Sequence, residues 1–86
     1  MLEKIKVEEL KALIKQAKYT VLEDTCITIC YIELHSGFSV VGRSATMDKA
    51  NFNKADGEKY AYEDAFSNLW ELEGYHRVAT AYARKQ

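Results

Sequence analysis

Apolar residues recur every three or four positions near the N-terminus, with charged residues between them. The apolar positions are Val7, Leu10, Ala12, Leu13, Ile14 and Ala17. This spacing places them on one face of an α-helix. Glutamates open the segment and lysines close it, an order that complements the helix dipole. The pattern therefore predicts an amphipathic helix over residues 7–18.

The middle of the chain has the composition of β-strands. Residues 25–34 and 38–46 are rich in β-branched residues, and Ser36 and Gly37 separate them. A two-residue loop that ends in glycine predicts a hairpin with a type I′ turn. A loop of two residues sets the register of the hairpin, so that Tyr31 lies across from Gly42. Residues 19–22 are a candidate third strand. Because both faces of this hairpin are apolar, we expect cover on both sides.

The last third of the chain has the pattern of one long helix. Asp48 and Asn53 are both candidates for its N-cap. The apolar stripe runs through Ala61, Ala65, Leu69 and Leu72. Gly74 lies inside the pattern, and we expect the helix to continue through it. The fold class is therefore α+β, with an N-terminal helix, an antiparallel hairpin and a long C-terminal helix packed on the sheet in a single domain over residues 1–86.

The charge balance narrows the classes of partner. Twelve Lys and Arg face thirteen Asp and Glu, for a formal charge of −1 among 86 residues. Such a chain has no strong field to attract a polyanion, so we expect no non-specific nucleic-acid binding. We expect no membrane association either, because no apolar run approaches the roughly 20 residues of a membrane span. These features predict a cytoplasmic protein.

No set of residues has the spacing of a catalytic or metal site. Cys26 and Cys30 are about 13 Å apart along a strand, too far for a disulfide or a shared metal. His35 is expected at the hairpin tip and His76 on a helix surface, away from a nucleophile. The acidic residues of the long helix indicate a solvated face rather than a phosphate-backbone mimic, because basic residues interrupt them. We therefore expect no catalytic residue, no metal and no cofactor, and a protein that works by binding.

One loop gathers residue types suited to a ligand. Arg43, Ser44, Asn51 and Phe52 lie where the second strand ends and the long helix begins. Arginine and a helix N-terminus both favour phosphate, and an aromatic ring stacks on a base. The alternative interpretation of these residues is that Phe52 packs in the core and Asn51 caps the long helix.

Several short segments are similar to a known family. They are Thr28–Leu34, Ser36–Gly42, Ala50–Phe52, Ala61–Tyr62 and Leu69–Tyr75. Together they resemble the phage gene-49/gene-66 product family of small accessory proteins of tailed phages and prophages, over roughly residues 25–76. The resemblance implies a phage origin and an accessory role, with no catalytic residues to carry over.

The resemblance leads to two expectations about the target, and in both of them the protein counteracts a host antiviral defence. A protein that sequesters a nucleotide immune signal would use Arg43, Ser44, Asn51 and Phe52. A protein that blocks a host effector such as a CRISPR–Cas complex would use exposed residues of the type found in interface hot spots, Tyr60, Tyr75 and Arg77. A regulatory protein-interaction module is the alternative, and a small enzyme is the least favoured class.

The apolar hairpin also predicts a homo-oligomer.

Overall fold

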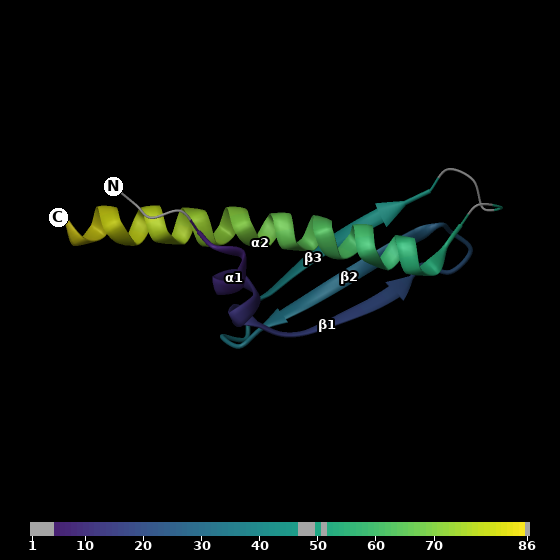
Figure 1. Cartoon of the computed structure of the whole chain (residues 1–86), viewed down its shortest axis with the longest axis horizontal. Coiled ribbons are helices and arrows are strands. Elements are labelled where there is room, and N and C mark those ends of the chain that lie inside the picture. Colours follow the sequence, from purple (N-terminus) through teal and green to yellow (C-terminus); the bar gives the residue numbers. More distant parts are fainter. Residues whose placement is uncertain (1–4, 47–49, 51, 86) are drawn as a thin grey trace.

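The computed structural model describes residues 5–46, 50 and 52–85, and it contains two helices and three strands (Figure 1). In chain order these are α1 (Val7–Leu13), β1 (Ile14–Val21), β2 (Ile27–Leu34), β3 (Ser39–Ala45) and α2 (Lys54–Arg84). The strands form one antiparallel sheet in the order β1-β2-β3. Helix α2 packs against β3 and β2 on one face of this sheet. The predicted α+β class, the long C-terminal helix and the third strand are confirmed.

The predicted helix over residues 7–18 was too long. Helix α1 ends at Leu13, and the chain passes directly into β1. In β1, Ala17, Tyr19 and Val21 alternate with polar residues and pair with residues of β2. This alternation with period two is typical of a strand. Pairing along most of β2 outweighs the five further helical residues, about 1.4 turns, that the sequence predicted. The match of Ala17 to a helical period was coincidental.

The predicted register of the hairpin was wrong by one residue. Tyr31 pairs with Val41, and Cys30 lies across from Gly42. The loop contains three residues, because Leu34 N–H donates to the Phe38 carbonyl and Gly37 takes a φ of 96°. A type I′ turn needs positive φ at two positions, which Ser36 does not readily adopt, whereas a three-residue loop needs it only at the glycine. A shift of one residue exchanges the two faces of a strand, so Val40 is buried and Val41 is exposed.

The core lies between the sheet and the first half of α2. Its buried apolar residues are Leu10, Cys30, Ile32, Leu34, Val40, Ala61, Ala65 and Leu69. Two of the three residues that α2 contributes are alanines, so the helix approaches the sheet closely. At the closest point, Gly42 lies directly against the backbone of Ala61 and Ala65. The opposite face of the sheet has no helix on it in the described residues, and there Tyr31 and Val41 are exposed.

Side chains of α2 also reach the outer edge of β3. The Asp64 carboxylate accepts a hydrogen bond of 2.9 Å from the Arg43 backbone N–H. The Asn68 side-chain amide donates one of 2.9 Å to the Val41 carbonyl. An edge strand otherwise presents such groups to another chain. The helix therefore occupies this edge of the sheet, and β1 forms the other edge.

Helix α2 is continuous through Gly74, as predicted, and runs for 31 residues. Its N-cap is Asn53, whose side chain accepts a hydrogen bond of 3.2 Å from the Asp56 N–H. The other predicted cap, Asp48, lies outside the described residues. At about 1.5 Å per residue the helix is about 46 Å long, whereas its buried residues lie between Ala61 and Leu69. Its C-terminal half therefore projects beyond the sheet (Figure 1).

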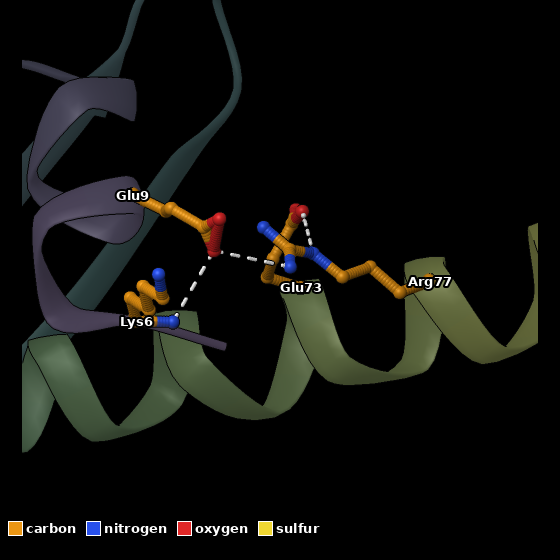
Figure 2. A network of polar contacts seen from close by, with 4 residues as sticks. All are labelled: Lys6, Glu9, Glu73 and Arg77. Carbon is orange, nitrogen blue, oxygen red and sulfur yellow. Dashed lines mark hydrogen bonds and ion pairs between the residues drawn. The ribbon is translucent and has the colours of Figure 1, made fainter. Parts of the chain in front are cut away.

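Helix α1 is held to the projecting part of α2 by one polar network (Figure 2). The Lys6 backbone N–H donates to Oε2 of Glu9 at 3.2 Å. The Arg77 guanidinium lies 3.2 Å from the same oxygen and 2.9 Å from a carboxylate oxygen of Glu73. These contacts join the two helices near the surface, while Leu10 is the buried residue of α1.

The network predicts a contribution to stability that depends on pH. The hydrogen bond from the Lys6 N–H, and then the Arg77 guanidinium, lower the pKa of Glu9 below its ordinary value of 4.5. A lowered carboxyl pKa stabilises the fold above the ordinary value, and this contribution is lost as the pH falls through the lowered pKa. We expect Glu9→Gln to reduce the free energy of unfolding at pH 7, and to reduce it by less as the pH is lowered to 2.5. An equal effect at both pH values in urea unfolding would contradict this role.

Candidate functional site

The candidate site is a cavity of about 260 Å³ between the end of β3 and the start of α2. Its walls are formed by Cys26, Ser44, Ala45, Thr46, Phe52, Asn53, Asp56, Gly57 and Tyr60. Antiparallel pairing of β2 and β3 brings residue 26 beside residue 46, where the Thr46 N–H donates to the Cys26 carbonyl. The cavity is slightly smaller than the range of about 300–1,000 Å³ that is typical of ligand sites.

The structure brings together half of the predicted ligand-binding residues. Ser44 and Phe52 line the cavity, and Asn51 lies outside the described residues. Arg43 is not among the cavity residues, because it alternates with Ser44 along β3 and lies on the face of the sheet away from α2. The cavity also includes Tyr60, which the sequence suggested only for a protein interface.

The cavity combines a helix N-terminus with two aromatic rings. The first turn of α2 forms one wall, and such a terminus favours an anionic group. Phe52 and Tyr60 supply surfaces on which a planar ring could stack. The Asp56 carboxylate is also part of the wall and opposes a second negative charge close to it. This arrangement suits a small planar ligand that carries limited negative charge.

Contacts beneath the cavity fix the start of α2 on the sheet. The Ser44 hydroxyl donates to the Gly57 carbonyl at 2.7 Å. Thr28 of β2 is fully buried, and its hydroxyl oxygen has no hydrogen-bond partner. A methyl group on Gly57 would lie 2.5 Å from that oxygen. Sequence reasoning missed the close approach of Gly57 to Thr28, because these residues are 29 positions apart in the chain.

The two cysteines are free thiols in different surroundings. Cys26 is half-buried in the cavity wall, whereas Cys30 is fully buried under α2. Burial raises the pKa of the Cys30 thiol, against the opposing effect of a hydrogen bond with Tyr19. A raised pKa keeps this thiol protonated at neutral pH, which makes it a poor nucleophile.

This difference predicts two rates of thiol modification. In native protein at pH 8, a reagent such as Ellman's reagent should modify one equivalent of thiol rapidly, at Cys26. Cys30 should react only after the protein unfolds, because it is inaccessible as well as protonated. Cys26→Ser should abolish the rapid phase. Two rapid equivalents in the folded protein would contradict the burial of Cys30.

A second cavity, of about 390 Å³, lies under the loop between β2 and β3. Both histidines of the chain line it, together with Phe38, Leu72 and other residues of mainly apolar character. The sequence had placed His35 and His76 on separate surfaces, and only the packing of α2 under the hairpin brings them to one cavity. In the described parts of the chain, no group of three or more His, Cys, Asp or Glu side chains could hold a metal ion.

The three residues predicted for a protein interface have different surroundings. Tyr60 and Tyr75 are exposed, and lie on α2 about 22 Å apart along its axis. Arg77 is held by Glu9 and Glu73, so its guanidinium serves the docking of α1. Over residues 5–46, 50 and 52–85, no helix combines the length and apolar character needed to cross a membrane.

The fold defines a small α+β protein in which a three-stranded antiparallel meander packs on a single long helix. Residues 5–80 match the family described as Phage protein (N4 Gp49/phage Sf6 gene 66) family. The match covers most of the chain, so this protein belongs to that phage family, as the sequence segments suggested. No curated protein and no solved structure gives a significant match.

Proposed function

We propose that this phage protein acts stoichiometrically in the host cytoplasm, by binding and not by catalysis. The proposed ligand is a small nucleotide immune signal, which the protein sequesters to counter a host antiviral defence. The observation that carries the proposal is the cavity at the N-terminus of α2, where Ser44, Phe52 and Tyr60 meet. Membership of a phage family supports the accessory role.

The cavity supports a nucleotide in two respects. The helix N-terminus favours a phosphate oxygen, and an aromatic ring beside it provides stacking worth about 1–3 kcal/mol per base. The volume of about 260 Å³ suits part of a nucleotide, with the remainder exposed at the opening. The Asp56 carboxylate repels a terminal phosphate, which carries two negative charges, more strongly than a phosphodiester, which carries one. The cavity therefore suits a phosphodiester better.

A second candidate function is blockage of a host effector such as a CRISPR–Cas complex. Its support is the exposure of the large aromatic residues Tyr60 and Tyr75 on one helix. Tyrosines are enriched among the residues that dominate binding energy at protein interfaces. A regulatory protein-interaction module would draw on the same surface.

The test is incubation of the purified protein with lysate from cells in which a nucleotide-signalling defence is active. After re-isolation and denaturation, mass spectrometry should detect an intact nucleotide at no more than one equivalent per chain. A co-purifying host protein without a nucleotide would instead favour the blocker. A chemically altered nucleotide produced over many turnovers would overturn the proposal, because stoichiometric binding cannot convert excess substrate.

Matched tyrosine variants locate the binding site. Tyr60→Ser should weaken nucleotide retention by about tenfold, because it removes one stacking surface. Tyr31→Ser is the control, since Tyr31 lies on the face of the sheet away from α2 and outside the cavity. Equal losses in the two variants, measured by calorimetry with the recovered nucleotide, would place the ligand elsewhere.

A further inference from the structure

The C-terminal half of α2 carries the most exposed apolar surface of this helix. The apolar residues on one side of it are Leu72, Tyr75, Val78, Ala79 and Tyr82, which we call the C-terminal stripe. Tyr75 is 74% exposed, Tyr82 67% and Val78 54%. Leu72 lines the second cavity under the loop between β2 and β3, and the rest of the stripe follows on the part of the helix that projects beyond the sheet. Helix α1 contacts another side of α2 through Arg77 and Glu73.

The spacing of the stripe indicates what kind of surface covers it. Leu72, Tyr75, Ala79 and Tyr82 follow one another at intervals of three, four and three residues. This is the repeat by which one helix packs along another in a coiled coil. A helical partner therefore fits the stripe better than an extended peptide or a small molecule.

We propose that the partner is a second copy of this chain, with the two C-terminal stripes packed antiparallel around a two-fold axis near Val78. In this arrangement Tyr75 packs against Ala79 of the second copy, and Tyr82 packs against Leu72 of the second copy. Each large side chain thus faces a smaller one. Two-fold symmetry makes both contacts occur twice, as an isologous interface requires.

The charges beside the stripe favour this orientation. Glu71 flanks one end of the stripe and Lys85 the other, 14 residues or two heptads apart. Antiparallel pairing places Glu71 beside Lys85 of the second copy, whereas parallel pairing in register leaves these two residues two heptads apart and unmatched. In the described residues neither side chain makes an ion pair within the chain. The charge pattern therefore complements itself only in the antiparallel pair.

The exposed area sets the strength of the pair. Fully buried tyrosines each bury roughly 150–250 Å², so the four tyrosines of two stripes contribute on the order of 500 Å². Leu72 and Val78 bring the total close to the roughly 1,000 Å² at the lower limit for specific interfaces. We therefore expect a dimer with a dissociation constant on the order of 10 μM, independent of any nucleotide ligand.

Sedimentation equilibrium of the full chain between 1 and 500 μM tests the pair. The mass should rise from 9.9 kDa toward that of a dimer. Tyr75→Ser should weaken the dimer by at least about tenfold, because the residue occurs twice in the interface. Tyr31→Ser should leave the constant unchanged. A monomer at all concentrations, or a dimer lost only in Tyr31→Ser, would overturn the proposal.

A charge exchange tests the orientation. Glu71→Lys should weaken the dimer several-fold, because it places two lysines together at each end. The double variant Glu71→Lys, Lys85→Glu should restore the constant to within about twofold of the wild type. Circular dichroism verifies that each variant is folded. A single variant that matches the wild type, or a double variant as weak as the single one, would contradict the antiparallel arrangement.

Discussion

The substitution Gly42→Ala should destabilise the protein by about 3 kcal/mol or more, the largest effect we expect from a single methyl group. The added carbon would lie 2.6 Å from the Cα of Ala65, and also against its backbone nitrogen and the Ala61 carbonyl oxygen. All three atoms belong to the backbone of α2, so no side chain can rotate away. The helix must move off the sheet, which disturbs the packing of Leu69 and Ile32 as well.

Urea unfolding followed by circular dichroism measures this effect. For a chain of this size the total stability is on the order of 5–10 kcal/mol, so the variant should unfold at much lower urea. Gly74→Ala is the matched control, because the nearest atom to its added carbon is Cδ1 of Ile5 at 3.9 Å. It should stabilise α2 by about 0.5–1 kcal/mol through helix propensity. Equal shifts for the two variants would contradict the close approach at Gly42.

The substitution Leu10→Ala should cost about 2–5 kcal/mol, the second largest effect we expect. Leu10 is fully buried and is the one buried residue of α1. A helix of seven residues is too short to be stable alone, so its position depends on this contact. The polar network of Glu9 and Arg77 lies near the surface and cannot compensate for the cavity.

Amide hydrogen exchange should show where the stability is lost. In Leu10→Ala, residues 7–13 should exchange much faster, while the amides of β2 should keep most of their protection. Val7→Ala is the matched control, because Val7 lies on the same helix and is 42% exposed. Its effect should be below about 0.5 kcal/mol. A Leu10→Ala variant as stable as the control would show that α1 is not anchored by this side chain.

Local patterns in the sequence were sufficient for most of the fold. The stripe through Ala61, Ala65 and Leu69 identified the buried face of α2, and Asn53 had the residue type of its cap. Residues 14–18 were assigned to the wrong element because Ile14 and Ala17 fit both a helical and an extended pattern. The choice between the two was made by pairing with β2, which is a contact between distant parts of the chain.

The site was predictable only in part, for a related reason. Ser44 lies near the end of β3 and Phe52 just before α2, on either side of the cavity, and their residue types suggested a ligand. Arg43 was assigned to the same site, but an alternating strand directs neighbouring residues to opposite faces. Tyr60 joins the cavity because it lies two helical turns after the cap, a relation that becomes clear only once the start of α2 is fixed.

The continuity of α2 has a consequence for how two ligands would be held. Gly57 in the cavity wall and Val78 in the C-terminal stripe belong to one unbroken rod and are about 32 Å apart along it. Rotation about a two-fold axis near Val78 then carries the second cavity to the far end of the pair, about 60 Å from the first. The proposed dimer would be elongated, with one ligand cavity at each end. A ligand bound in one cavity would be too far away to contact a ligand or residue in the other. The two cavities would therefore bind their ligands independently. The binding curve in a ligand titration would be hyperbolic rather than sigmoidal.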